Sequence, residues 1–294
     1  MRTGAAIYCF NDGAKLARRV ASLLPARCVK IRTHHFPDGE SLVQVEPRVA
    51  REAILIRSLD QPDAKLLPTL LAADALRRAG ARRVIAVAPY LPYMRQDKMF
   101  APGQPVSQRV IGDILGRYFD RVLTIEAHLH RIERLSDVIP SRQKSESLSA
   151  AFAIQAWIRR VREDCVVVGP DQESRRWIDA IAADSDHEFA VGEKQREGDR
   201  NVRVRFDGMR RYERAIIVDD IASSGATLAA TARALRGQGI RVIDAIVVHA
   251  LFAPGALGLI RRAGIRRLLS CDTIAHRTNA ISVAPTIAEA LRSR

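Results

Sequence analysis

Two adjacent carboxylates, Asp219 and Asp220, are followed by a run of small and hydroxylated residues, IASSGAT at 221–227. A segment rich in Ala and Leu, with helical spacing, continues to Gly237. The N–H groups of such a loop and first helical turn attract an anion, and the helix dipole adds to the attraction. Carboxylates suit ribose hydroxyls or a divalent cation. The stretch predicts a sugar-phosphate site, although an ordinary capped helix after a strand has the same composition.

Two further groups of basic residues suit a polyphosphate ligand. Arg95 and Lys98 lie in a stretch rich in Pro and Gly, 90–105, which predicts a long loop able to close over a ligand. Lys194 and Arg196 are two residues apart in a segment expected to be extended, so both point the same way and suit charge on a transferring phosphoryl group. A solvated surface loop and an exposed charge run would explain the same residues without any chemistry.

A histidine and a carboxylate follow two other predicted strands. His128, two residues before His130, follows the strand expected at 121–125, and Asp171 follows the one expected at 165–169. Ligands of α/β proteins bind at the carboxyl ends of parallel strands, so either histidine is a candidate for a phosphate or a metal, and Asp171 is a candidate for Mg²⁺ or a ribose hydroxyl. The spacing of the two histidines is by itself weak evidence of a metal site.

The elements that must position these residues alternate along the chain, which predicts an α/β fold. Strands are expected at 5–10, 28–34, 41–45, 53–57, 83–88, 121–125, 165–169, 189–191, 202–206, 215–218, 241–249 and 267–270. Helices are expected at 15–24, 63–79, 106–118, 148–162, 175–183, 255–263 and 286–292, besides the one that ends at 237. The Pro-Asp-Gly signal predicts a tight turn at 36–40.

A helix–glycine–strand pattern at 75–88 recurs at 234–247, which gives modest support to two similar domains. The polar stretch 140–147 is the best linker candidate. We therefore expect an N-terminal domain over 1–142, a C-terminal domain over 143–284 and a closing helix over 285–294 that packs back on the N-terminal domain.

The composition narrows the class of protein. The chain has 294 residues, of which 47% are hydrophobic and only 5% aromatic, as suits aliphatic α/β layers. We expect no membrane span, no secretory signal, and a cytoplasmic protein whose four cysteines are reduced. The net charge of +14 suits a polyphosphate substrate, and the absence of a recognition motif argues against nucleic acid.

In combination these motifs resemble the ribose-phosphate pyrophosphokinase family over nearly the whole chain, within the type I phosphoribosyltransferase superfamily. The matching pieces are FPDGE at 36–40, PYLPYMRQDKMFAPGQPVS at 89–107, His128, PD at 170–171, KQR at 194–196 and DDIASSGAT at 219–227. The RQDK loop is highly specific, because other phosphoribosyl-binding families lack it. No GxxxxGK[ST] motif is present, so a P-loop kinase does not compete.

The resemblance implies an α/β fold of two similar phosphoribosyltransferase-type domains, each a mainly parallel sheet flanked by helices. It implies transfer of the diphosphoryl group of Mg-ATP to the anomeric hydroxyl of ribose 5-phosphate, which gives phosphoribosyl pyrophosphate and AMP. Mg²⁺ is then the cofactor, and subunits associate as dimers or hexamers with a shared active site. A phosphoribosyltransferase that consumes phosphoribosyl pyrophosphate and a non-catalytic regulatory relative remain as alternatives.

The resemblance also implies residue roles. The residues that stabilise the transition state are Lys194 and Arg196. The ATP-binding residues are Arg95, Gln96, Asp97, Lys98 and His128, joined by Phe36, Asp38 and Glu40 of a neighbouring subunit. The residues for ribose 5-phosphate are Asp219, Asp220, Ser223, Ser224, Gly225, Ala226 and Thr227. The metal ligands are His128 and Asp171.

The sequence departs from the family pattern at three places near these residues. QESRR at 172–176 replaces a glycine pair before a basic residue, and the larger side chains could narrow the pocket near the sugar or the metal. Glu126 stands where an aspartate is usual. Ala226 replaces a frequent glycine, which is tolerable only if its φ angle is negative.

Overall fold

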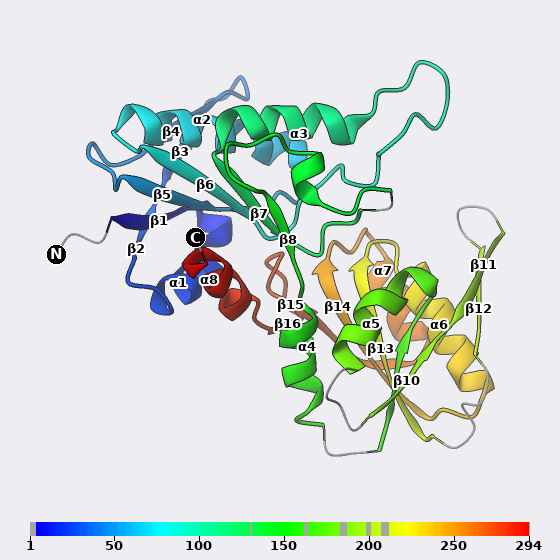
Figure 1. Cartoon of the computed structure of the whole chain (residues 1–294). Coiled ribbons are helices and arrows are strands. Elements are labelled where there is room, and N and C mark those ends of the chain that lie inside the picture. Colours follow the sequence, from blue (N-terminus) through cyan, green and yellow to red (C-terminus); the bar gives the residue numbers. More distant parts are fainter. Residues whose placement is uncertain are drawn as a thin grey trace. The chain divides into compact units, whose positions relative to one another are not determined.

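The structure is a computed structural model that describes residues 4–129, 131–161, 164–182, 187–197, 201–206 and 212–293, with the side chains of 176–177, 194–197, 201–203 and 205 left out. The chain divides into two compact units. The first contains Met1–Leu148 and Ala284–Arg294, and the second contains Ser149–Val283. Each unit is built around a six-stranded parallel sheet (Figure 1).

The sheet of the first unit has the strand order β2-β1-β5-β6-β7-β8. Its strands are β1 (Ala5–Cys9), β2 (Arg27–Lys30), β5 (Glu52–Ile56), β6 (Arg83–Ala88), β7 (Arg121–Ile125) and β8 (Glu146–Leu148). The helices α2 (Pro62–Arg78) and α3 (Ser107–Tyr118) cover one face, and α1 (Ala14–Ser22) and α8 (Ala284–Arg292) lie together on the other (Figure 1). The strands β3 (Arg32–His35) and β4 (Ser41–Gln44) form a separate hairpin, and η1 (Asn11–Gly13) and η2 (Leu135–Asp137) are 3₁₀ turns.

The sheet of the second unit has the order β10-β9-β13-β14-β15-β16. Its strands are β9 (Val166–Gly169), β10 (Glu188–Val191), β13 (Arg214–Ala222), β14 (Val242–Ala250), β15 (Ile265–Cys271) and β16 (Asn279–Ile281). The helix α4 (Ala151–Ile158) packs beside α5 (Arg175–Ala182), and α6 (Ala226–Gly237) beside α7 (Ala256–Arg262). The short helix η3 (Gln172–Ser174) follows β9, and β11 (Glu193–Glu197) and β12 (Asn201–Arg205) form a hairpin.

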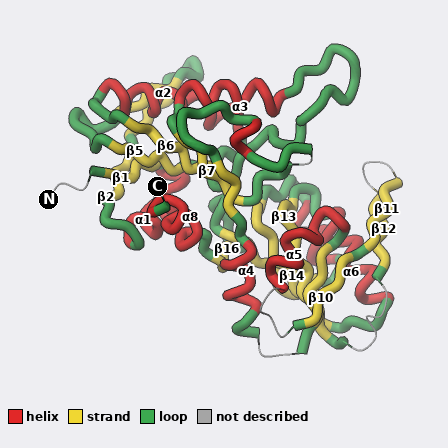
Figure 2. The backbone as a smooth tube through the Cα atoms, in the orientation of Figure 1, coloured by secondary structure: helices red, strands yellow, loops and turns green. Residues whose placement is uncertain are grey.

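The two sheets repeat one plan, which confirms the predicted α/β fold of two similar halves (Figure 2). In both sheets, the second strand in sequence lies at one edge, beside the first. The other four strands follow on the far side of the first strand, in sequence order. The repeated pattern at 75–88 and 234–247 covers the end of α2 with β6 and the end of α6 with β14, which are equivalent elements. The last strand of each sheet leads into a helix of the other unit, since α4 follows β8 and α8 follows β16.

The strands of both sheets are apolar because helices cover both faces of each sheet, and aliphatic residues make up most of both cores. In β1, Ala6, Ile7 and Tyr8 have no exposed surface, and Val167 and Val168 of β9 are equally buried. Separate hydrophobic clusters fill the two units. Within the described parts of the chain, every helix is too short or too polar to span a membrane.

The sequence-based element bounds were wrong at several places. The helix expected at 148–162 is the shorter α4, and no strand was expected where β16 lies. β13 continues to Ala222, four residues beyond the predicted end, because it stays paired with β14 as far as the partners Ala222 and Ala250. The strand expected at 28–34 is two strands, β2 and β3. The predicted linker 140–147 contains the start of β8, whose few polar residues carry no clear strand pattern.

A buried carboxylate, Asp244, fixes the amino-terminal ends of β14 and β15. Its Oδ2 accepts hydrogen bonds from Nη2 of Arg266 at 2.9 Å and from Nη2 of Arg267 at 2.7 Å, and its Oδ1 accepts one from Nε of Arg266 at 3.1 Å. Burial alone would raise the pKa of Asp244, but the two guanidinium groups outweigh it and the pKa lies below the usual value.

We expect Asp244→Asn to lower the free energy of unfolding by roughly 1–3 kcal/mol at pH 7, because two arginines lose a charged acceptor. A carboxylate with a lowered folded pKa stabilises above its unfolded value of about 4 and loses this effect as the pH falls through the folded value. Urea unfolding at a series of pH values should therefore show a constant gap between wild type and variant above about pH 5 that closes in acid. Equal stability at pH 7 would contradict the assignment.

Candidate active site

The loop between β13 and α6 has the geometry of an anion site. Ser223 and Ser224 are exposed, and Gly225, at φ 77°, is the residue from which α6 starts. The backbone holds the loop in place, since Phe252 N–H donates to Ala222 O at 2.9 Å and Ala253 N–H donates to Ser223 O at 3.0 Å. The first N–H group of α6, that of Ala226, donates to the Ser224 hydroxyl at 3.3 Å, and the next N–H groups have no acceptor within the helix.

Gly225 allows the loop to pack closely against α7. A Cβ atom at this position would lie 2.9 Å from Cγ1 of Ile260 and 3.2 Å from the Ala256 carbonyl oxygen. Its left-handed backbone also disfavours any other residue. Ala226 is the first residue of α6 and its φ is negative, so the departure from glycine at this position costs no backbone strain.

Three carboxylates stand at the ends of neighbouring strands in the second unit. Asp219 and Asp220 are half-buried near the end of β13, and Asp219 Oδ1 accepts the Asp220 N–H at 3.0 Å. Asp171 follows β9, which pairs directly with β13. The sheet thus brings the Asp171 segment and the predicted ribose-binding pair, Asp219 and Asp220, to the carboxyl ends of two neighbouring strands.

Asp171 also shapes the chain that departs from the family pattern. Its Oδ1 accepts the Ser174 N–H at 3.3 Å and caps η3, and the Ser174 hydroxyl donates back to the Asp171 carbonyl. Gly169 makes room for this turn, because a Cβ atom there would lie 2.1 Å from the Ser174 hydroxyl. Gln172 and Glu173 are consequently exposed, while Ser174 is buried.

The predicted transition-state residues lie in β11, but their side chains are outside the described part. The backbone of Lys194 pairs with Val204 and that of Arg196 with Val202. Gly192 N–H, just before β11, donates to Gly169 O at the end of β9 at 2.9 Å. The hairpin therefore starts from the sheet edge that carries Asp171.

In the first unit, residues 89–106 form the predicted long loop, and Asp97 anchors it. The Asp97 side chain is 2% exposed, and its Oδ1 accepts from Nη1 of Arg131 at 2.8 Å. Its buried Oδ2 has no hydrogen-bond partner among the described residues. Gln96 accepts a hydrogen bond from the Ser107 hydroxyl at 2.5 Å, whereas Arg95 and Lys98 are exposed. The loop thus has an anchored inner side and an exposed cationic side.

His128 follows β7 in a turn that β8 stabilises. Glu126 has φ 39°, an unusual angle for a residue other than glycine, and its N–H donates to Leu148 O at 2.9 Å. Ala127 N–H donates to the Ser147 hydroxyl at 2.8 Å. His128 is half-buried after this turn, and His130 lies outside the described residues.

The predicted turn at 36–40 is the exposed tip of the β3–β4 hairpin. Phe36 N–H donates to Glu40 O at 2.9 Å, and Glu40 N–H donates to Asp38 Oδ1 at 3.1 Å. Phe36 is 39% exposed and packs edge-on against His34, with ring centroids 4.7 Å apart. The tip therefore presents an aromatic ring and two carboxylates to solvent.

Sequence reasoning missed the residues that support these loops. Arg131 pairs with Asp97, Ser107 holds Gln96, and Ala253 holds Ser223. Arg131 and Ala253 stand outside every motif, and Ser107 is only the last residue of the motif 89–107. Each of the three acts across a gap in sequence, so no local signal marks its supporting role. In the described residues, no group of three or more His, Cys, Asp and Glu side chains could hold a metal ion.

Comparisons with known proteins place the chain in a family. A family model described as the N-terminal domain of ribose phosphate pyrophosphokinase matches residues 5–118, and a phosphoribosyl transferase domain model matches residues 145–285. A ribose-phosphate pyrophosphokinase of Methanopyrus kandleri is 32% identical over 98% of both chains, and one of Pyrococcus abyssi is 30% identical over 96% of both.

A solved structure shows the same fold at lower sequence similarity. The phosphoribosylpyrophosphate synthetase of Mycobacterium smegmatis superposes with a TM-score of 0.82 at 24% identity, over 99% of this chain and 98% of that one. The solved structure shows the fold, whereas the curated relatives, matched over nearly their full length, and the two family models show the family. The chain belongs to the ribose-phosphate pyrophosphokinase family.

Proposed function

We propose that the protein is a ribose-phosphate diphosphokinase. In this reaction the anomeric hydroxyl oxygen of ribose 5-phosphate attacks the β-phosphorus of ATP, and the bond between Pβ and the oxygen that it shares with Pα breaks. AMP leaves with that oxygen, and the hydroxyl proton is released. The products are phosphoribosyl pyrophosphate and AMP. The relatives named above carry the name of this activity.

The observation that carries the proposal is the segment from Asp219 to Thr227, which spans the end of β13, the loop and the start of α6. Its first residues place two carboxylates near the end of β13, and its last residues form the start of α6. We assign the 5-phosphate to the hydroxyl groups and N–H groups of 223–227, and the ribose hydroxyls to Asp219 and Asp220. The separation of donors for the phosphate from acceptors for the sugar suits a sugar phosphate better than a free anion.

We assign ATP to the exposed side of the loop 89–106 and to His128. Arg95 and Lys98 are exposed cations that suit the triphosphate, while the Asp97–Arg131 pair holds the loop in position. Asp97 is therefore proposed to act on ATP through the loop. Lys194 and Arg196, at alternate positions of β11, would stabilise charge on the transferred group.

Mg²⁺ is the cofactor that suits this chemistry. It takes hard oxygen ligands and is commonly held by one or two carboxylates together with substrate phosphates. Asp171, half-buried at the end of β9, offers such an oxygen, and we propose Asp171 and His128 as its protein ligands. When bound, the ion would neutralise phosphate charge. The four cysteines are free thiols, which suits the cytoplasmic location proposed for this enzyme.

We also propose that subunits associate and share active sites. The hairpin tip carries a half-exposed Phe36 beside Asp38 and Glu40, a combination suited to a nucleobase held by a second subunit. Leu42 on β4 and Leu67 and Leu71 on α2 are 40–60% exposed, which is apolar surface of the kind that interfaces bury.

Phe36→Ala is expected to raise the KM for ATP about tenfold or more, through loss of stacking surface, while folding is unchanged. Mixing it with an Arg95→Ala chain should restore part of the activity, because a mixed assembly would contain some sites with both residues intact. Activity is measured before and after the subunits are mixed and re-equilibrated. If the subunits exchange but the mixture regains no activity, the active site is not shared between subunits.

The reaction itself is tested by ³¹P NMR of the purified protein with Mg-ATP and ribose 5-phosphate. We expect AMP and a pyrophosphorylated ribose to appear together and in equal amounts. Intact ATP in the presence of folded protein that binds both ligands would overturn the proposal. Phosphoribosyl transfer from added phosphoribosyl pyrophosphate would then be measured next.

A further inference from the structure

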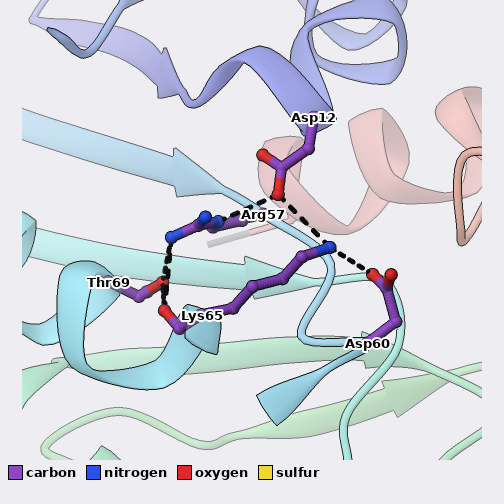
Figure 3. Close-up of polar contacts among 5 residues, drawn as sticks. All are labelled: Asp12, Arg57, Asp60, Lys65 and Thr69. Atoms are coloured by element: carbon purple, nitrogen blue, oxygen red, sulfur yellow. Dashed lines mark hydrogen bonds and ion pairs between the residues drawn. The ribbon is translucent and has the colours of Figure 1, made fainter. Parts of the chain in front are cut away.

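Four charged side chains meet at the carboxyl ends of β1 and β5 in the first unit, and none of them has a role in the proposed reaction (Figure 3). Nε of Arg57 and Nζ of Lys65 both lie 3.2 Å from the same oxygen, Oδ2 of Asp12. Nζ of Lys65 also lies 2.7 Å from Oδ1 of Asp60. One carboxylate oxygen thus receives two cations, which is how a protein commonly holds an oxyanion.

The two cations are held in place by more than the Asp12 carboxylate. Nη1 of Arg57 donates to the Lys65 carbonyl at 3.2 Å and lies 3.4 Å from the Thr69 hydroxyl (Figure 3). The Arg57 guanidinium also lies 3.8 Å from the centre of the Phe10 ring. The side chains of Arg57 and Lys65 are only 12% and 14% exposed. Cations this buried require an anionic partner, since burial without one is costly.

The cluster lies where the second unit has its predicted phosphate loop. The shared strand order makes β5 equivalent to β13 and α2 equivalent to α6. Both helices start after a residue with left-handed backbone, Gln61 at φ 58° in α2 and Gly225 at φ 77° in α6. This comparison rests on the phosphate role proposed for 223–227, whereas the charges and distances around Asp12 do not depend on it.

We propose that the first unit contains a second oxyanion cradle, formed by the side chains of Arg57 and Lys65, and that the Asp12 carboxylate occupies it as a built-in anion. The free ligand that it would take is inorganic phosphate or a phosphate monoester. Asp12 is 32% exposed, so its removal opens the cradle to solvent. Arg57 and Lys65 then face Asp60 alone, with one positive charge in excess. Asp12 thus restricts the wild-type chain to one phosphate-loop site.

The test compares Asp12→Ala and Asp12→Asn with wild type and with Asp74→Asn. Asp74 is an exposed carboxylate paired with Arg78 on α2, so its substitution makes the same change in net charge elsewhere. Inorganic phosphate is titrated against chloride at constant ionic strength, and binding stoichiometry and Tm are measured. We expect one additional phosphate per chain in both Asp12 variants and a phosphate-dependent rise in Tm about 2–4 °C greater than in the two controls.

Further variants separate this site from the catalytic one. Adding Lys65→Gln to Asp12→Asn should abolish the additional phosphate, because one of the two cations is lost. If Asp12→Ala folds only when phosphate is present, that result supports the cradle. Phosphate binding is then measured on Asp12→Asn, which keeps the shape of the side chain. Phosphate binding and Tm shifts equal to those of Asp74→Asn would overturn the proposal. Phosphate stoichiometry and Tm are measured without turnover. The cradle can therefore be confirmed or rejected even if the protein does not catalyse the proposed reaction.

Discussion

Lys194→Ala is expected to lower kcat by a factor of about 10² or more, while the protein remains folded and binds both substrates with little change. The reason is that a cation which acts on charge developing during phosphoryl transfer stabilises the transition state more than the ground state. Steady-state kinetics with Mg-ATP and ribose 5-phosphate would show a fall in kcat with KM values nearly constant.

The matched control is Gln195→Ala, one residue along the same strand. Gln195 lies between Lys194 and Arg196 in the sequence of β11, is uncharged and has no assigned role. The control should retain kcat within about twofold, and circular dichroism should be the same for both variants. An unchanged kcat in Lys194→Ala would remove this lysine from the mechanism.

Gly225→Ala is expected to raise the KM for ribose 5-phosphate by a factor of about 10 or more. The added Cβ would lie 2.9 Å from the Ile260 side chain, and the alanine would have to adopt a φ of 77°. Either α7 or the loop must move, and the N–H groups assigned to the 5-phosphate would then lose their alignment. The KM for ATP should change much less, because the loop 89–106 is untouched.

Gly237→Ala is the control on the same helix. Gly237 ends α6, and a Cβ atom there would meet nothing within 4 Å, so alanine should leave the KM unchanged and keep or raise stability by up to about 1 kcal/mol. Isothermal titration with ribose 5-phosphate measures the difference directly. Equal affinities for the two variants would show that the loop does not hold the 5-phosphate.

Local pattern predicted the fold well where each element carries its own signal. The apolar runs of β1, β5, β6 and β13 are buried on both faces, and glycine after α2 and α6 marks where those helices stop. The weak strands β8 and β16 have only three residues each, and pairing with a neighbour creates them. β13 continues through Asp219 and Asp220 for the same reason, since its partner β14 extends as far.

Motifs located the candidate site, but they did not give the packing that supports it. The need for Gly225 follows from Ile260, 35 positions further along the chain, and the position of Asp97 follows from Arg131. The Asp12 cluster carries no motif at all, because it combines residues from three elements whose proximity depends on the strand order. Its decisive contact, between Arg57 and Asp12, joins residues 45 positions apart, so composition and spacing contain no record of it.

The exchange of α4 and α8 between the two units has a consequence for how the chain folds. α8 contributes buried Ile287 and Ala288, and Ala290 O accepts a hydrogen bond from Arg121 of β7 at 3.2 Å. α8 follows β16 in sequence, so the residues that complete the packing of the first unit are synthesised only after the whole of the second unit. The first unit therefore cannot finish folding before the second has been made, although its own sheet ends at β8.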